Sequence, residues 1–467
     1  MNVENFRLHG HELIDWIADY YENIEELPVK PNVEPYEVFN NLKQKPPKNG
    51  ESFNVIFNDF NHKILPGITH WQHPKFLAYF PANASFPSIL AELLTSALGA
   101  QCMSWITSPA ATELEELVMN WLRDMTGLPK EFSGVIEDTA STSALCSILT
   151  AREKISDYKI NESGFGNNIY RIYCSEEAHS SIEKAMKIAG IGRENLVKIK
   201  TNDEFSMLTE DLEHKILSDI QSGYKPLCVV ATLGTTSSTA VDPIEDIGKI
   251  CKKYGIWFHV DAAYAGTAML LDEMRHHLKG IDYVDTYVFN PHKWMFTNFD
   301  CSAYFVRDKE ALIKTFDILP EYLKTDLDTK VNNYRDWGIQ LGRRFRALKL
   351  WFVIRHYGTD GLKEKVKQHI NYASIMKDYL DKDPDFEIMA PMLFNLICFR
   401  YNPQNLIEEE IDLVNKELLD TINATGKAFL THTKLKGKFA LRFVASNTNL
   451  EERHIHEAWR LIQSCKQ

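Results

Sequence analysis

The chain has 467 residues, of which 44% are hydrophobic and 25% charged, and its formal net charge is −12 at pH 7. This composition is typical of a globular protein with two or three domains, and the acidic balance disfavours binding to nucleic acid. The sequence has no apolar run of about 18 residues, so we expect no membrane-spanning helix.

Residues 1–85 are predicted to form a helical arm. Apolar residues recur at helical spacing in ELIDWIADYYENI, and proline-rich stretches then interrupt the pattern. An apolar stripe on such a helix needs a surface to pack on. That surface is either the rest of the same chain or, as we favour, a partner subunit.

Residues 86–356 are predicted to form a large α/β domain. Short β-branched or aromatic runs such as IWFHVD and VDTYVFN alternate with helical segments such as IEDIGKICKKYG. This alternation predicts a mostly parallel sheet with helices on both faces. Ligands bind such sheets at the carboxyl ends of the strands. Residues 357–467 mix helices with short strands and predict a smaller α+β domain.

Asp261 and Lys293 each follow one of these strand-like runs. Taken alone, Asp261 could equally well cap a helix, and an isolated lysine is more often a surface residue. Taken together, they fit an enzyme that uses pyridoxal 5′-phosphate (PLP), which needs a lysine for its aldehyde and an acid for its pyridine nitrogen. Partial burial beside aromatic residues would also lower the pKa of the Lys293 amine and make it a nucleophile.

A run of small and hydroxylated residues, Thr139-Ala140-Ser141-Thr142-Ser143, leads into an apolar helical segment. Free backbone N–H groups at a helix N-terminus bind phosphate. A simple Ser/Thr cap would explain the same run equally well.

The cysteines and histidines show no pattern of a disulfide framework or of a metal site. The eight cysteines are scattered without a Cys-x-x-Cys pair, and the first residues do not resemble a signal peptide, so we expect a reducing, cytoplasmic setting. The pairs His70/His73 and His454/His456 have no further ligands at a suitable spacing. We interpret all four histidines as structural and expect no metal.

Several motifs together resemble the group II PLP-dependent decarboxylases, and most of all the aromatic-L-amino-acid decarboxylases. In chain order over residues 69–351 they are THWQHPKFLAYFP, SPAATELE, EEAHSS, ATLGTTSSTAVDP, HVDAAYAG, NPHKW, NFDCSA and LGRRFRALKLW. The resemblance implies the PLP-dependent transferase fold type I and a homodimer with its active site at the interface. It also implies conversion of an aromatic amino acid to an arylalkylamine and CO2.

The resemblance implies a role for individual residues. Lys293 matches the lysine that bonds to the cofactor, Asp261 the partner of the pyridine nitrogen, and His179 the histidine that stacks on the ring. Tyr334 matches a tyrosine of a mobile loop that is donated across the dimer interface and reprotonates the substrate. In isolation, His179 would be interpreted as a helix cap and Tyr334 as a surface residue. The other cofactor positions are Thr139, Ala140, Ser141, Thr236, Ala263, Asn290 and His292.

The substrate pocket implied by the resemblance has aromatic walls, which favour an aromatic side chain through offset stacking. Ala82, Gln101 and Met103 differ from the threonine, isoleucine and phenylalanine of the animal dopa-type pattern. Gly342 lies where plant relatives tend to carry glycine for indolic and serine for phenolic substrates, although a backbone requirement would also explain it. We therefore expect tryptophan first, then phenylalanine or tyrosine, then dopa or 5-hydroxytryptophan. The pocket positions are Trp71, Tyr79, Phe80, Pro81, Ala82, Gln101, Met103 and Gly342.

Three alternatives to simple decarboxylation are open. An aromatic aldehyde synthase couples decarboxylation to oxidative deamination, and such relatives tend to have phenylalanine where this chain has Tyr334. A transaminase would need an arginine for a second carboxylate, and Arg343, Arg344 and Arg442 are candidates. A catalytically silent binding protein on the same fold would be expected to lack some of the residues named above.

Overall fold

The computed structural model describes residues 1–318, 330–404 and 406–466. The chain divides into two compact units. The larger unit comprises Ala82–Ser374 and Ile388–Cys398, and the other comprises Met1–Pro81, Ile375–Glu387 and Phe399–Gln467. The expected N-terminal arm and most of the expected C-terminal segment therefore contribute to the same unit.

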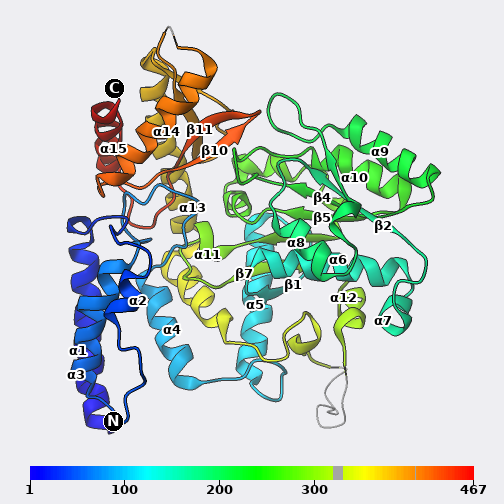
Figure 1. The fold of residues 1–467 in the computed structure, drawn as a ribbon. Helices are drawn as coiled ribbons and strands as arrows, with labels where there is room; N and C mark the ends of the chain where they lie inside the picture. The colour runs from blue at the N-terminus through cyan, green and yellow to red at the C-terminus, as the bar shows by residue number, and fades with distance from the viewer. Residues whose placement is uncertain (319–329, 405, 467) are drawn as a thin grey trace. The chain divides into compact units, whose positions relative to one another are not determined.

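Helices and strands follow one another along the chain as labelled in Figure 1. The helices are α1 (Val3–Glu22), α2 (Glu37–Asn41), α3 (Phe53–Asp59), α4 (Phe86–Leu98), α5 (Pro109–Thr126), α6 (Ala140–Ile155), α7 (Lys159–Ser163), α8 (Ser181–Ile188), α9 (Thr209–Gln221), α10 (Ile244–Tyr254), α11 (Pro291–Trp294), α12 (Lys309–Phe316), α13 (Arg346–Lys382), α14 (Glu408–Ala424) and α15 (Glu452–Cys465). The strands are β1 (Ser133–Glu137), β2 (Tyr170–Ser175), β3 (Leu196–Ile199), β4 (Lys225–Thr232), β5 (Trp257–Asp261), β6 (Thr286–Phe289), β7 (Ser302–Val306), β8 (Phe386–Ile388), β9 (Leu396–Tyr401), β10 (Thr431–Leu435) and β11 (Lys438–Val444). Within the described ranges, every helix is too short or too polar to cross a membrane.

The larger unit is built on a seven-stranded sheet in the order β1-β7-β6-β5-β4-β2-β3. Strands β2 to β6 pair in parallel, and β7 lies antiparallel between β6 and β1. Every residue of β5, β6 and β7 is buried. This is the pattern of a sheet that is covered on both faces. The expected mostly parallel sheet is confirmed. A second sheet has four strands in the order β10-β11-β9-β8.

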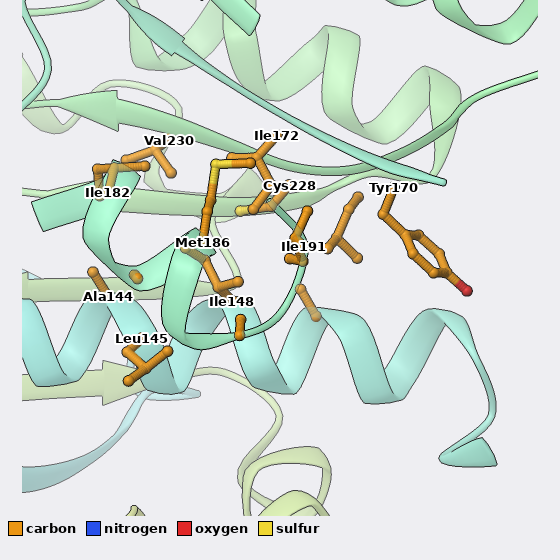
Figure 2. Packing of buried hydrophobic residues seen from close by; sticks show 14 of the residues in the cluster. Ala144, Leu145, Ile148, Tyr170, Ile172, Ile182, Met186, Ile191, Cys228 and Val230 are labelled. Atoms are coloured by element: carbon orange, nitrogen blue, oxygen red, sulfur yellow. The ribbon is translucent and has the colours of Figure 1, made fainter. Parts of the chain in front are cut away.

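Helices cover the two faces of the large sheet, with α9 and α10 on one face and α6 and α8 on the other (Figure 1). Figure 2 shows how Ile148 of α6 and Met186 of α8 pack on Ile172 of β2 and Val230 of β4, all of them buried. On the opposite face the hydroxyl of Tyr173 donates to Asp219 of α9 at 2.8 Å. Removing one such buried aliphatic side chain costs about 2–5 kcal/mol of stability, so this core holds the strand ends in place.

The parallel register brings the carboxyl ends of three strands to one edge. Thr232 at the end of β4 is paired with Asp261 at the end of β5, and Asp261 is paired with Val288 of β6. The residues that follow β4, β5 and β6 therefore emerge side by side.

Candidate active site

Asp261 lies at the buried end of β5, where its Oδ1 atom accepts a hydrogen bond from the N–H of Ala263 at 3.0 Å. The carbonyl of Ala263 accepts the N–H of Asn290 at 3.0 Å. The turn after β5 is thus bonded directly to the turn after β6. Asp261, Ala263 and Asn290, three of the residues named from the sequence, come together here.

Lys293 lies in the short helix α11, which begins with Pro291. Proline suits a first helical position because its fixed φ matches the helix and its missing N–H has no partner there. The Lys293 N–H donates to the carbonyl of Asn290 at 2.9 Å. Burial lowers the pKa of the Lys293 amine, and the negative charge of Asp261 opposes this change. A lysine with a lowered pKa supplies more of the neutral amine, which is the nucleophilic form.

Asn83 is a site residue that the sequence reasoning missed. Its side-chain amide donates to the carbonyl of Lys293 at 2.6 Å, and its backbone N–H donates to the carbonyl of His292 at 3.1 Å. Asn83 directly follows the pocket position Ala82 in the motif FLAYFPANAS, which is the one signal that could have drawn attention to it.

His179 precedes helix α8 and interacts electrostatically with both Asp261 and Lys293. Burial lowers the pKa of its imidazole, Asp261 raises it and Lys293 lowers it. The Nδ1 atom accepts the backbone N–H of Ser181 at 3.1 Å and lies 2.8 Å from the Ser181 hydroxyl. Nδ1 is therefore unprotonated, and the neutral ring carries its proton on Nε2. The helix-cap interpretation and the site interpretation of His179 are compatible.

The start of α6 contains the next group of residues that were named from the sequence. Thr139 has an extended backbone, and its carbonyl accepts the N–H groups of Thr142 and Ser143, each at 3.1 Å. The N–H groups of the first helical residues, Ala140 and Ser141, have no acceptor within the helix. They are available to an anion.

Asn290, which precedes α11, and His292, which lies within it, have different polar surroundings. His292 is buried, and burial lowers the pKa of its imidazole to about 3, so the ring is neutral. Its Nδ1 accepts the N–H of Cys301 at 2.9 Å. The side-chain oxygen of Asn290 is buried and has no hydrogen-bond partner among the described residues. A buried amide oxygen without a partner is costly and marks a place where a ligand can donate.

Thr236 is exposed on the turn that follows β4. The turn packs closely against Ala265. Gly234 has a φ of +90°, and a Cβ at this position would lie 2.6 Å from the Cβ of Ala265. The N–H groups of Gly234 and Thr235 both donate to the carbonyl of Ala240, at 3.0 and 2.9 Å. These hydrogen bonds hold the backbone of the turn that carries Thr236.

Tyr334 does not join this group. It is 1% exposed and packs in a core cluster with Val135, Cys146 and Val288. Burial raises the pKa of its hydroxyl well above the ordinary value, and the charge of Glu115 adds to the increase. The surface position that its polar sequence context suggests is therefore not observed. The start of that polar segment, residues 324–329, lies outside the described residues.

The substrate positions named from the sequence fall into both units. Trp71 and Tyr79 are exposed and stacked with 5.8 Å between ring centroids, and the guanidinium of Arg442 lies 5.4 Å from the ring centroid of Phe80. These residues and the buried Pro81 belong to one unit, and Ala82, Gln101, Met103 and Gly342 belong to the other.

Gln101 and Gly342 are direct neighbours within the larger unit. The side-chain oxygen of Gln101 accepts the N–H of Arg343 at 2.7 Å. A Cβ at Gly342 would lie 3.3 Å from the Gln101 side-chain nitrogen. The space beside Gly342 is thus bounded by a polar amide that is held in place.

The histidines of the two possible metal motifs take part in hydrogen bonds within the protein. His70 bonds to the Tyr20 hydroxyl at 2.9 Å, and His73 accepts the N–H of Lys75 at 2.9 Å. His454 accepts the N–H of Glu451 at 2.9 Å. These contacts agree with the structural interpretation.

A cavity of about 860 Å³ lies at the opposite edge of the large sheet. Its lining includes Trp257, which begins β5, and Arg307, which follows β7. Because Asp261 ends β5, this cavity is separated from the residues around Lys293 by the length of the strand. The carboxyl edge, with a nucleophilic amine, a carboxylate and anion-binding N–H groups, is the better candidate for chemistry.

The chain is similar to known proteins over almost its whole length. A family model described as the pyridoxal-dependent decarboxylase conserved domain matches residues 35–402. Phenylacetaldehyde synthase of Arabidopsis thaliana is 41% identical over 99% of this chain and 96% of its own length, and tyrosine decarboxylase 4 of Petroselinum crispum is 41% identical over 99% and 93%. The crystal structure of Oryza sativa TDC with PLP and tryptamine has a TM-score of 0.97 at 36% identity and covers 100% of this chain and 98% of that one.

Proposed function

Because the chain belongs to the pyridoxal-dependent decarboxylase family and is a PLP-dependent carboxy-lyase, we propose that it converts an aromatic L-amino acid, with tryptophan preferred, to the arylalkylamine and CO2. The observation that carries the proposal is that the turns with Asp261 and Lys293 are hydrogen-bonded to each other at the carboxyl edge of the sheet, through Ala263 and Asn290. We expect phenylalanine and tyrosine to follow tryptophan, and dopa and 5-hydroxytryptophan to come last.

The residues at this edge fit PLP. The first N–H groups of α6 suit its phosphate, and the buried Asn290 oxygen without a partner can accept from the ligand. The carboxylate of Asp261 suits the pyridine nitrogen, and Ala263 leaves room for the ring. We assign Thr139, Ala140, Ser141, Asn290 and His292 to the cofactor on this basis.

When bound, PLP supplies an aldehyde that condenses with amines and a ring that accepts the electron pair of the breaking Cα–carboxylate bond. Lys293 contributes the amine to which the cofactor attaches. Asp261 keeps the pyridine nitrogen protonated, and a charge-assisted hydrogen bond of this kind is worth about 1.5–3 kcal/mol. His179 would lie against the ring as a neutral imidazole, and Thr236 would offer its hydroxyl to the substrate carboxylate.

Tyr334 is our candidate for the acid that protonates Cα after CO2 has left. A tyrosine hydroxyl is protonated at neutral pH, as a proton donor requires. Because Tyr334 is buried in its own subunit, the role also requires that its segment moves toward the site that it serves, which we place in a partner subunit.

We also propose that the protein forms a homodimer. Five apolar side chains of α4 are between 46% and 65% exposed, and a contiguous apolar patch of this kind marks an interface. The N-terminal arm is proposed to pack on the partner, since α1 also has exposed apolar residues. Size-exclusion chromatography with light scattering tests this, and a monomer that retains full activity would contradict it. The α4 side chains are Phe86, Leu90, Leu93, Leu94 and Leu98.

A cytoplasmic location is proposed from the cysteines, none of which forms a disulfide among the described residues. Tryptophan is favoured because Gly342 leaves more room beside the Gln101 amide than a side chain would. The relative whose structure contains tryptamine supports the same choice.

One experiment tests the reaction and the substrate together. The protein with PLP is incubated with each aromatic amino acid, and amine, aldehyde and hydrogen peroxide are measured. We expect tryptamine to form fastest without peroxide. Absence of amine with every substrate contradicts the proposal. Aldehyde with an equal amount of peroxide would instead favour the aldehyde-synthase activity named for the Arabidopsis relative.

A further inference from the structure

Glu137 is a buried carboxyl that none of the roles above uses. It ends β1, two residues before Thr139, and is 2% exposed. Its Oε1 atom has no hydrogen-bond partner among the described residues. Buried carboxyls are normally paired or hydrogen-bonded, because an isolated charge loses its hydration without compensation. Glu137 therefore needs an explanation.

The carboxyl of Glu137 packs against the backbone of Gly338. A Cβ at position 338 would collide with the Oε1 atom of Glu137, so a larger residue there would force that carboxyl to move. Gly338 belongs to residues 333–345, which we name the Tyr334 segment. The carboxyl of Glu137 is thus in direct contact with the segment that carries the proposed proton donor.

Other contacts tie the Tyr334 segment to the same end of β1. The guanidinium of Arg343 bonds to Glu115 and, at 3.0 Å, to the carbonyl of Ile136. The side chain of Gln340 donates to Asp138 at 3.0 Å. Near Tyr334 itself, the N–H of Arg335 donates to the carbonyl of Met103 at 2.8 Å. The Oε1 atom of Glu137 lies among these contacts without a hydrogen-bond partner among the described residues.

The positive charges around Glu137 do not offset the effect of burial on its pKa. Burial raises its pKa to about 7. Arg343 and Arg346 favour the ionised form, whereas Asp138 and Glu115 oppose it. Arg343 is already paired with Glu115, and Arg346 with Asp300 at 3.0 and 3.1 Å. The other titratable neighbours, Cys146 of α6 and Tyr304 of β7, are uncharged at neutral pH because burial raises their pKa values.

We propose that Glu137 is a proton-dependent positioning residue, whose neutral carboxyl lets the Tyr334 segment pack on the end of β1 and whose ionisation loosens that packing. The charge of an ionised Glu137 facing the Gly338 backbone is only partly offset by Arg343 and Arg346, which also pair with Glu115 and Asp300. Opening of the segment, which admits water to the carboxylate, then becomes easier. The catalytic consequence rests on the proposed role of Tyr334. The packing consequence does not.

Hydrogen exchange of the holoenzyme, followed by mass spectrometry at pH 6 and pH 8 and corrected for intrinsic rates, tests the packing. If opening restores an ordinary pKa to Glu137, protection of the Tyr334 segment should fall about tenfold between these pH values. Glu137→Gln has the same shape but does not titrate, so its protection should not change with pH. Glu131→Gln removes an exposed charge just before β1 and should behave like the wild type.

Equal protection of the wild type at both pH values would overturn the proposal, and so would a Glu137→Gln variant that keeps the tenfold change. If Glu137→Gln does not fold, the wild-type profile from pH 5.5 to 8.5 still decides, because a midpoint near 7 is required. As a second readout, kcat of Glu137→Gln should lose a decline near pH 7 while KM is unchanged. If no aromatic amino acid is decarboxylated, the proposed function fails and the exchange result still stands.

Discussion

The side-chain amide of Asn83 donates a 2.6 Å hydrogen bond to the backbone carbonyl of Lys293, a residue 210 positions later in the chain. Together with the bond from the Asn83 N–H to His292, this contact holds the backbone of α11 from outside the helix. Asn83 therefore helps to hold the backbone from which the Lys293 side chain extends.

Replacing Asn83 by alanine should leave the carbonyl of Lys293 without its donor. We expect a loss of about 1–3 kcal/mol in the free energy of unfolding and weaker PLP binding. Ser85→Ala is the matched control, because the Ser85 hydroxyl donates to the carbonyl of Phe296 at 2.7 Å, beyond α11. It should lower stability with little change in PLP affinity. Equal PLP affinity in both variants would contradict a specific role for Asn83.

Asp261→Asn should keep the fold but remove the negative charge that we propose for the pyridine nitrogen. We expect kcat to fall roughly 10- to 150-fold, which corresponds to the loss of one charge-assisted hydrogen bond of 1.5–3 kcal/mol. Asp285→Asn removes the same charge from the opposite edge of the sheet, where Asp285 accepts the N–H of Phe258. An equal fall of kcat in both variants would argue against the proposed pairing.

Tyr334→Phe should shift the product from amine toward aldehyde. Without the hydroxyl of the proposed donor, Cα would no longer be protonated promptly, and oxygen could intercept the reaction. The measurement is the ratio of amine to aldehyde, with peroxide determined alongside. Trp337→Phe changes a neighbouring ring, 5.2 Å from Tyr334, and should leave the product unchanged. A Tyr334→Phe variant that forms only amine would remove Tyr334 from the proposed mechanism.

Gly342→Ser should weaken the preference for tryptophan. The new side chain would meet the Gln101 amide, since a Cβ there lies only 3.3 Å from its nitrogen. We expect the ratio of kcat/KM for tryptophan to that for tyrosine to fall about tenfold or more. Adding Gln101→Ala should restore part of the ratio by making room. If the ratio does not change in the single variant, Gly342 serves the backbone rather than the pocket.

The stability of the protein should depend on pH through Glu137. Its pKa is about 7 in the folded state against an ordinary value of 4.5, so the folded state binds more protons between these values. The contribution of Glu137 to the free energy of unfolding is fully present below pH 4.5. It falls by on the order of 3 kcal/mol as the pH rises through 7. The gain in Tm of Glu137→Gln over the wild type should therefore be larger at pH 8 than at pH 5. A gain that is independent of pH would contradict this assignment.

Some features of the site follow from the sequence alone. Alternating strands and helices predict a parallel sheet, and the handedness of such connections brings the residues after successive strands to one edge. That rule is enough to bring Asp261 and Lys293 together. The phosphate-binding start of α6 is predicted on similar local grounds, because a helix N-terminus binds anions whatever lies elsewhere. The motif series then identifies the family.

Only the tertiary structure decided how these residues are supported. The bond from Asn83 to Lys293, the contact of Glu137 with Gly338 and the bond from Arg343 to Gln101 join parts of the chain that are about 200 residues apart or more. Tyr334 lies in a polar stretch of sequence, yet it is buried. Hydrophobic periodicity describes the face of one element, whereas these contacts depend on which loops the packed sheet and helices bring together. The sequence therefore determined the chemistry at the strand ends, and tertiary packing decided which residues hold it in place.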